Sequence, residues 1–446
     1  MSVEKFGPVR AGLLGLGTVG TGTFEVLWRN QQEITRRAGR RIEITRVATR
    51  SLERAREAVK GRARVDDDVF GLVSDPDVDV VIELIGGLGI ARELVMAAID
   101  NGKHVVTANK ALLALHGNEI FAAASRREVQ IAFEAAVAGG IPIIKAVREG
   151  LTANRIESIA GIINGTTNFI LSEMRDKGLA FDVVLAEAQR LGYAEADPTF
   201  DIEGVDAAHK ATILSAIAFG TPVSFDKAYV EGITALQSED IRYAEQLGYR
   251  IKLLGITRSR VVDGGQVGIE LRVHPTLIPA KRLIANVEGA MNAVWVKGDA
   301  VGHTMYYGKG AGAEPTASSV IADLVDVARM LTADPDHRVP HLAFQAESMQ
   351  EFPILPISEV ETAYYLRLRV SDEPGVLADI TRILAEQSIS IDAALQREPD
   401  EGEAQTDIIL LTHRTIEKQV DRAISGIEAL PTVLSRVIRI RLEDLD

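Results

Sequence analysis

The chain has 446 residues, of which 46% are hydrophobic and 25% are charged, proportions typical of a globular protein with several domains. Its net charge of −14 argues against a nucleic acid or an anionic membrane surface as the partner. The chain has no cysteine, secretion signal or long apolar stretch, which excludes disulfides and thiol chemistry and leads us to expect a cytoplasmic protein.

A glycine-rich motif stands near the N-terminus. Residues 9–14 form a short apolar run, residues 15–20 read Gly-Leu-Gly-Thr-Val-Gly, and residues 21–30 predict a helix. This order of strand, glycines and helix is the context of a dinucleotide-binding fingerprint, in which the helix N-terminus faces a phosphate. A close-packed structural turn is the alternative. The residues expected to contact a cofactor are Gly15, Leu16, Gly17, Thr18, Val19 and Gly20.

The second predicted strand, residues 42–48, indicates which dinucleotide is preferred. An NAD-specific fold usually carries an acid just after this strand, and here Arg50 takes that place. A guanidinium suits the 2′-phosphate of NADP, so we expect NADP, with NAD as a second option. The alternative is an arginine that only faces solvent.

Two more buried strands are predicted at 79–85 and 104–106, and they alternate with helices such as 91–101. This pattern indicates a parallel sheet of the α/β class, in which ligands bind beyond the carboxyl ends of the strands. Thr107 and Lys110 follow the second of these strands, so both are candidates to contact substrate or cofactor. For Lys110, a role at the start of a helix is the alternative.

Two loops of small residues follow. Residues 131–142 begin as a strand and end in small residues, whose exposed carbonyls could coordinate a hard cation that the sequence does not identify. Asn164 and Thr166 precede a predicted helix at 169–176, where they could cap the helix or bind a ligand at its N-terminus.

The segment 188–210 places several carboxylates and one lysine before an apolar helix. Residues 211–220 carry no charge, so Lys210 should lie at the boundary between solvent and the protein interior. Asp206 and Glu203 precede Lys210 by four and seven residues, a spacing that puts the three on one helical face. A lysine held in this way suits an acid that delivers a proton, whereas an exposed helical ion pair is the alternative.

The rest of the chain predicts the domain organisation. Residues 225–296 suggest antiparallel strands with one solvated face, and a glycine-rich loop at 308–317 precedes a helix at 318–330 that returns to the nucleotide domain. From residue 364 onward the β-α-β-β-α-β order of a ferredoxin-like fold is predicted. We expect a nucleotide-binding domain at 1–135 completed by about 305–340, an α+β catalytic and dimerisation domain at 136–304, and a third domain at 358–446.

Five motifs together resemble the homoserine dehydrogenase family, in the form that has a C-terminal ACT domain. The segment 188–210 matches the family signature at every defined position. The other motifs are Thr-Ala-Asn-Lys at 107–110, Gly-Gly-Ile-Pro at 139–142, Asn-Gly-Thr-Thr-Asn at 164–168 and the glycine-rich loop that contains Gly310. The resemblance spans nearly the whole chain.

This resemblance implies the NAD(P)H-dependent interconversion of L-aspartate 4-semialdehyde and L-homoserine, a step toward threonine and methionine. Lys210 corresponds to the proton-donating lysine of the family and Asp206 to its orienting carboxylate. Lys110 corresponds to a lysine that polarises the substrate, and the resemblance does not decide which lysine is the proton source. Expected to bind substrate are Glu195, Asp201, Lys110, Asn164 and Thr166, and Gly310 is expected to contact the cofactor.

The resemblance also implies a sodium ion, an effector and self-association. The cation ligands would be Glu134 and the carbonyls of Val137, Gly139 and Ile141. Threonine is the usual effector of the ACT domain, and the family forms homodimers or homotetramers. Removing residues 358–446 should leave the chemistry largely intact and abolish any threonine response, unless the ACT domain is needed for assembly. The alternatives are another Rossmann dehydrogenase for an amino-acid-like alcohol, and a non-catalytic amino-acid-sensing regulator that retains a nucleotide-binding fold.

Overall fold

The computed structural model describes residues 7–262, 264–331, 338–396 and 404–445, which form two compact units. Unit 1 takes its described residues from Met1–Gly165, Asp206–Asp226 and Met291–Phe352. Unit 2 takes them from Thr166–Val205, Lys227–Ala290 and Pro353–Asp446. Each unit combines segments from different predicted domains, so the division into three domains stays a prediction.

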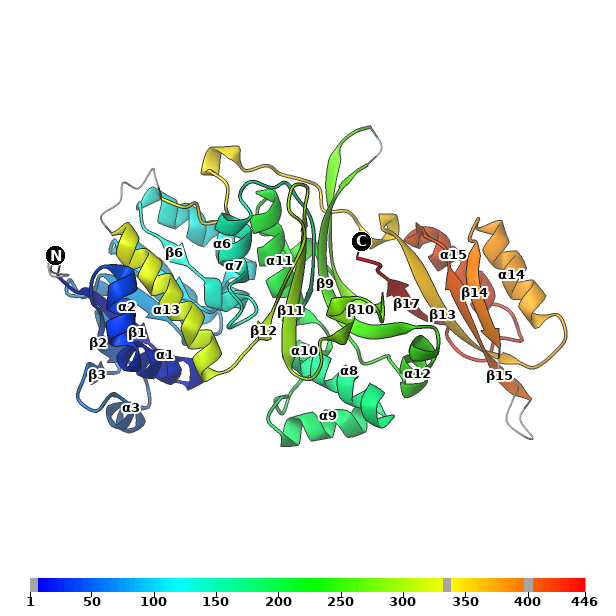
Figure 1. The fold of residues 1–446 in the computed structure, drawn as a ribbon, viewed down its shortest axis with the longest axis horizontal. Coiled ribbons are helices and arrows are strands. Elements are labelled where there is room, and N and C mark those ends of the chain that lie inside the picture. Colours follow the sequence, from blue (N-terminus) through cyan, green and yellow to red (C-terminus); the bar gives the residue numbers. More distant parts are fainter. Residues whose placement is uncertain (1–6, 263, 332–337, 397–403, 446) are drawn as a thin grey trace. The chain divides into compact units, whose positions relative to one another are not determined.

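A six-stranded sheet forms the core of unit 1 (Figure 1). Its strands are β1 (Val9–Leu14), β2 (Ile42–Ala48), β3 (Arg64–Asp66), β4 (Val80–Glu83), β5 (His104–Thr107) and β6 (Ile131–Ala132). The order is β3-β2-β1-β4-β5-β6, and every neighbouring pair is parallel. This confirms the predicted Rossmann-type sheet. The winding reverses between β1 and β4, which is where such sheets bind ligands.

Helices cover this sheet. They are α1 (Thr18–Arg29), α2 (Gln31–Ala38), α3 (Leu52–Val59), α4 (Val69–Ser74), α5 (Gly89–Asp100), α6 (Lys110–Arg126) and α13 (Ala313–Met330). Figure 1 shows α13 beside α1 and α2, and apolar side chains of α1 and α13 share one buried cluster with β1 and β2. The predicted return of the chain to the nucleotide domain is therefore confirmed. The returning helix begins five residues earlier than expected.

Unit 1 also contains an antiparallel set of strands and two further helices. The strands are β7 (Ile156–Ile162), β11 (Met291–Gly298) and β12 (Gly302–Lys309), in the order β12-β11-β7. The helices are the short α7 (Ile143–Lys145) and α11 (Val205–Phe219). Nearly every residue of α11 is buried, as the uncharged run after Lys210 predicts.

Unit 2 begins with helices and a long antiparallel pair of strands. The elements are α8 (Gly165–Lys177), α9 (Phe181–Arg190), α10 (Thr199–Ile202), β8 (Tyr229–Val230), α12 (Ser238–Gln246), β9 (Tyr249–Val261) and β10 (Val267–Pro279). The antiparallel pairing of β9 with β10 confirms the prediction. The solvated face expected for this region is wrong for β10, which is buried on both faces from Gly268 to Ile278 because its polar side chains pair with one another and with other strands.

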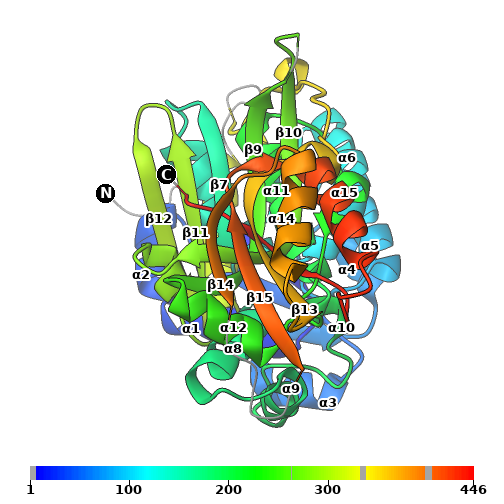
Figure 2. The ribbon, with the colours of Figure 1, turned by 90° about the vertical axis from the view of Figure 1, so that its right-hand side faces the viewer.

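The C-terminal part of unit 2 has the predicted ferredoxin-like topology. Its elements are β13 (Glu361–Ser371), α14 (Val376–Glu386), β14 (Ile391–Gln396), β15 (Gln405–Thr412), β16 (Thr415–Ile416), α15 (Glu417–Glu428) and β17 (Ile438–Leu442). The strand order is β17-β13-β15-β14, and Figure 2 shows α14 and α15 together on one face of these strands. On its other side β17 pairs in parallel with β10, so it is an internal strand of the sheet.

Candidate functional site

The glycine-rich loop lies at the carboxyl end of β1. Gly15 has a φ of +89°, and a Cβ on it would lie 2.9 Å from the carbonyl oxygen of Leu84. A Cβ on Gly20 would overlap the carbonyl oxygen of Gly15, whereas one on Gly17 would meet nothing within 4 Å. The tight turn and the close packing predicted for Gly15 and Gly20 are therefore confirmed. Contact with a cofactor stays a prediction.

The remaining loop residues contribute through their backbone. Leu16 is buried in the apolar cluster and Val19 packs against it, so neither side chain is directed to a ligand. Thr18 begins α1, whose N-cap is Gly17 without a side-chain cap. The first N–H groups of this helix thus face the loop, the arrangement that binds phosphate.

The loops after β4 and β5 are tied together by a buried acid that the sequence analysis did not single out. Glu83 accepts hydrogen bonds from the backbone N–H groups of Ile85 (2.9 Å) and Gly86 (3.0 Å) and from the Thr107 hydroxyl (2.7 Å). The Thr107 hydroxyl also accepts the N–H of Asn109 at 3.0 Å. The side chain of Thr107 therefore shapes the loop, and the only signal for Glu83 was a carboxylate at the end of a buried strand.

Two lysines converge on the carboxylate of Asp206. Lys210 Nζ lies 2.6 Å from Asp206 Oδ2, and Lys110 Nζ lies 3.2 Å from Oδ1. Asn164 Nδ2 donates to Oδ2 at 2.8 Å, and Lys210 Nζ also donates to the carbonyl oxygen of Ile163 at 2.8 Å. Asp206, Lys210, Lys110 and Asn164 were all named from the sequence, but it was not foreseen that Lys110 and Asn164 would meet the carboxylate that holds Lys210.

The fold places each of these side chains for a local reason. Asp206 and Lys210 are one turn apart in α11, Lys110 is the first residue of α6, and Asn164 follows β7. The side chain of Asp206 is only 4% exposed and that of Lys210 11%, whereas Lys110 is 36% exposed. The site therefore has one buried and one accessible ammonium.

The surrounding groups keep the carboxylate of Asp206 ionised. Burial alone would raise the pKa of Asp206, but the charges of Lys210 and Lys110 and the hydrogen bonds from Lys210 and Asn164 hold that pKa well below its usual range. Asp206 stays ionised and orients both ammonium groups. Next to it, burial lowers the pKa of His209 to about 4, and its ring packs against Phe225 with centroids 4.4 Å apart.

Two predicted substrate residues of unit 2, Glu195 and Asp201, lie on the turn around α10, and the third, Thr166 on α8, contacts this turn. Thr166 Oγ1 donates to the carbonyl oxygen of Tyr193 at 2.7 Å and lies 3.2 Å from Asp201 Oδ2. Glu195 has an exposed side chain, and its carbonyl oxygen accepts from Gln189 Nε2 at 3.1 Å. Thr166 and Asp201 are thus brought together, and Glu195 stands on the same turn.

One sequence expectation about this segment is wrong. Glu203, Asp206 and Lys210 do not share one helical face, because Gly204 has a φ of +82° and separates α10 from α11. Glu203 instead accepts a hydrogen bond from the hydroxyl of Thr234 at 3.1 Å. A left-handed glycine ends the helix where spacing alone suggested continuity.

The predicted cation loop is built around two buried carboxylates. Both oxygens of Glu134 accept backbone N–H groups, from Ile144 and Lys145 at 2.8 Å each, and its own N–H donates to Asp323 Oδ2 at 2.7 Å. Burial raises the pKa of Glu134 to about 7 and, together with the charge of Glu134, that of Asp323 to about 8. The carbonyl of Gly139 accepts from the Ser319 hydroxyl at 2.6 Å.

Val137 and Ile141, the other predicted cation ligands of this loop, lie on either side of Gly139 in the sequence. Val137 and Ile141 are both buried, and the N–H of Ile141 donates to the carbonyl of Ala138 at 3.0 Å. Gly310 packs against this loop, because a Cβ on Gly139 would overlap the Gly310 carbonyl.

Arg50, the predicted contact to NADP, is exposed and lies two residues beyond β2.

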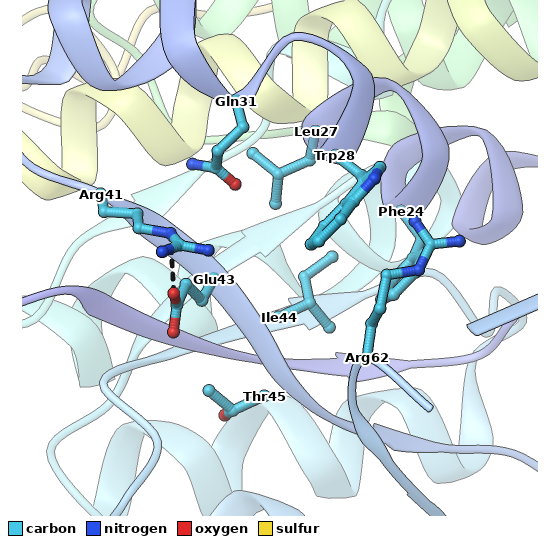
Figure 3. Close-up of a pocket in the computed structure, with 9 residues that line it drawn as sticks. All are labelled: Phe24, Leu27, Trp28, Gln31, Arg41, Glu43, Ile44, Thr45 and Arg62. Carbon is cyan, nitrogen blue, oxygen red and sulfur yellow. Dashed lines mark ion pairs between the residues drawn. The ribbon is translucent and has the colours of Figure 1, made fainter. Parts of the chain in front are cut away.

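A separate pocket of about 110 Å³ lies between α1 and the first half of β2 (Figure 3). Arg62 stands over the ring of Trp28 with its guanidinium carbon 4.6 Å from the centroid, and Arg41 pairs with Glu43. This pocket lies toward the amino end of β2, whereas the glycine loop lies at the carboxyl end of β1. None of the predicted site residues lines it.

The described residues contain no group of three or more histidine or acidic side chains that could hold a metal ion. None of the helices in the described ranges has the length and apolar character needed to cross a membrane.

Comparisons with known proteins agree with this geometry. The family model for homoserine dehydrogenase matches residues 142–325, the model for the NAD-binding domain of homoserine dehydrogenase matches residues 15–134, and the ACT domain model matches residues 364–432. The homoserine dehydrogenase of Pseudomonas aeruginosa is 60% identical, over 98% of this chain and 100% of its own length.

Solved structures give the same result. The crystal structure of a homoserine dehydrogenase from Thiobacillus denitrificans has a TM-score of 0.93 and 68% identity, over 98% of this chain and 99% of that chain. A hyperthermophilic archaeal homoserine dehydrogenase in complex with NADPH has a TM-score of 0.60 and 25% identity, over 72% of this chain and 97% of that chain. These matches favour an oxidoreductase over a non-catalytic regulator, and the chain belongs to the homoserine dehydrogenase family.

Proposed function

We propose that this chain interconverts L-aspartate 4-semialdehyde and L-homoserine with NADP(H), and that Lys210, Asp206 and Lys110 form its catalytic centre. The observation that carries the proposal is the convergence of two lysines on one buried carboxylate. Such a centre supplies positive charge and a proton at the place where a carbonyl oxygen becomes negative.

The chemistry of the proposed centre follows from its charges. A reduced nicotinamide, when bound, would supply a hydride to the aldehyde carbon, whose oxygen would then need a proton. Asp206 keeps Lys210 and Lys110 oriented, so that one ammonium polarises the oxygen and the other delivers the proton. In the reverse direction the same lysine accepts the proton of the homoserine hydroxyl.

The substrate's amino group is the proposed ligand of the acidic turn in unit 2. Asp201 and Glu195 are carboxylates on this turn, and Thr166 orders it by bonding the carbonyl of Tyr193. Carboxylates favour an ammonium ligand by charge. Asn164, which donates to Asp206, is a further proposed substrate contact.

The cofactor proposal rests on the glycine loop and on Arg50. The open space at Gly17 and the uncapped start of α1 fit a pyrophosphate. Arg50 would hold the 2′-phosphate, and the archaeal relative in complex with NADPH supports NADP as the preferred form. Thr107 and Gly310 are proposed to shape the cofactor site through their loops.

We further propose a monovalent cation, most simply sodium, at the loop 134–141. Its ligands would be carbonyls of Val137, Gly139 and Ile141, with Glu134 close by. The buried carboxylates of Glu134 and Asp323 support this, because a nearby positive charge would offset their repulsion. Oxygen donors are the ligand type that such hard cations take.

The proposed regulation uses the ACT domain. The loop of residues 372–375 opens α14 and lines a pocket together with Thr381, Gln396 and Ile408. We propose that a small amino acid such as threonine binds there. A cytoplasmic location and assembly as a homodimer or homotetramer complete the proposal.

The decisive experiment is a spectrophotometric assay of homoserine oxidation with NADP and with NAD, each with and without threonine. The proposal expects reduction of the cofactor, a higher kcat/KM with NADP, and a changed rate when threonine is present. An absence of homoserine-dependent reduction with either cofactor would contradict it. A sodium titration against choline chloride at constant ionic strength tests the cation, whose binding should raise the melting temperature.

A further inference from the structure

The last strand of the chain buries a network of charges inside unit 2. Arg441 on β17 is fully buried, as are its neighbours Glu417, the first residue of α15, and Tyr364 on β13. β17 is hydrogen-bonded to β13 on one side and to β10 on the other. The family's ACT model ends at residue 432, so this strand lies beyond it.

The guanidinium of Arg441 joins two parts of unit 2. Its Nε donates to Glu417 Oε2 at 2.8 Å, and its Nη2 donates to Glu417 Oε1. In the other direction Nη1 donates to Glu231 Oε2 at 2.7 Å and Nη2 donates to the hydroxyl of Tyr229 at 3.1 Å. The Tyr229 hydroxyl donates to the same carboxylate oxygen of Glu231 at 2.8 Å.

This arrangement requires an arginine. A lysine presents a point charge, whereas the planar fork of arginine donates to Glu417 with two nitrogens and still reaches Glu231. The guanidinium also lies 4.9 Å from the centroid of the Tyr229 ring, a cation–π distance. Arg441 and Glu417 are both buried, so the loss of either would deprive the other of its direct ion-pair partner inside the protein.

The residues that Arg441 holds lead directly to the substrate turn. Glu231 follows β8, and its N–H donates to the carbonyl of Val273 on β10 at 2.8 Å. Two residues later the N–H of Ile233 donates to the carbonyl of Ile202 at 2.8 Å. Between them a Cβ on Gly232 would overlap the Ile202 carbonyl, so the two backbones are in contact.

Ile202 is the last residue of α10, directly after Asp201. The connection therefore runs from α15 through Glu417, Arg441 and Glu231 to the backbone that supports Asp201. Every step is a hydrogen bond, a close backbone contact or a covalent neighbour within unit 2. A shift of Arg441 would displace the carboxylate that is proposed to bind the substrate's amino group.

We propose that Arg441 is a positioning residue for the substrate turn, acting through Glu231 and Tyr229. The inference rests on the proposed function, since it gives Arg441 a role only if the turn binds substrate. It also alters the expectation that removal of residues 358–446 leaves the chemistry intact. Such a truncation would remove β17 and leave the buried Glu270 and Arg272 of β10 without Glu443, to which Arg272 donates.

The test uses the full-length protein and variants on both sides of the connection. Glu231→Ala and Tyr229→Phe remove the partners of Arg441 at positions that are only partly buried, so these variants should fold. Arg441→Met removes the guanidinium that joins Glu417 to Glu231. Arg439→Met is the matched control, because Arg439 lies on the same strand and pairs with Glu417 at 3.2 Å but has no bond to Glu231.

The expected result is a split between kinetic constants. In Glu231→Ala and Arg441→Met the KM for homoserine should rise by about threefold or more, while the KM for NADP stays within about 1.5-fold of wild type. Arg439→Met should leave both KM values near those of wild type. Amide hydrogen exchange of residues 199–204 should become faster in Glu231→Ala by about tenfold, and exchange in α13 should not change.

Two outcomes would overturn the proposal. One is an unchanged KM for homoserine and unchanged exchange of residues 199–204 in folded Glu231→Ala. The other is an equal effect of Arg439→Met, which would show that any charge loss on β17 acts alike. If the wild-type protein failed to oxidise homoserine, the proposed function would fall, while hydrogen exchange would still decide whether Arg441 and Glu231 order the turn.

Discussion

Replacing Asp206 by asparagine tests the proposed centre most directly. The carboxylate is 4% exposed and lies 2.6 Å from one ammonium and 3.2 Å from the other. At about 4 Å and an effective dielectric constant near 20, a pair of unit charges interacts by about 4 kcal/mol. Breaking a buried pair by removing one partner typically costs about 3–5 kcal/mol, and here two cations lose the same counterion.

Asp206→Asn should therefore lower both stability and activity. The melting temperature, measured by differential scanning fluorimetry, should fall by several degrees, and kcat/KM for homoserine should fall by about 10²-fold or more. Asp206→Glu, which keeps the charge, should recover part of the activity. Glu33→Gln on α2 makes the same chemical change in an exposed ion pair and should alter neither quantity much. Wild-type melting and turnover in Asp206→Asn would refute the reasoning.

Three further substitutions test other parts of the argument. Lys210→Ala should reduce kcat by about 10²-fold or more with an unchanged KM for NADP, whereas the same change at the exposed Lys281 should have no effect; normal turnover would remove Lys210 from the mechanism. Arg50→Asp should shift the ratio of kcat/KM values from NADP toward NAD, and an unchanged ratio would show that Arg50 only faces solvent. In sodium-free buffer, burial and the charge of Glu134 raise the pKa of Asp323 from 3.8 to about 8, so the folded chain binds that proton more tightly than the unfolded chain, and stability should fall as the pH rises through this range. Asp323→Asn should flatten this fall in a series of melting curves between about pH 5 and pH 8, and an unaltered slope would contradict the assignment.

Local patterns were sufficient for much of the fold and for part of the site. The Rossmann-type sheet and the ferredoxin-like unit follow from strand and helix periodicities, which act over a few residues. The turn at Gly15 follows from its neighbours in sequence, and the pairing of Asp206 with Lys210 follows from the helical repeat. These features depend on contacts between residues that are close along the chain.

Features that depend on distant segments were not predictable. The sequence named Lys110 and Asp206 separately, but only the folded chain brings residues 96 positions apart to one carboxylate. Likewise β10 alternates as a half-exposed strand would, yet it is buried on both faces because Glu443 and Arg441 come from the far end of the chain. Charged side chains look solvent-exposed in a sequence, and only a partner supplied by tertiary packing allows them to be buried.

The amino-acid sequence by itself thus determined the fold class, the family and the residue types of the proposed site. Tertiary structure decided which charged side chains form ion pairs and that β17 is an internal strand. It also decided that Gly204 separates α10 from α11, so that Glu203 and Lys210 are not on the same helix. The physical reason is the distance along the chain over which each kind of interaction acts. Backbone propensities and helical spacing act between near neighbours, whereas ion pairing and desolvation depend on whichever segments the completed fold brings together.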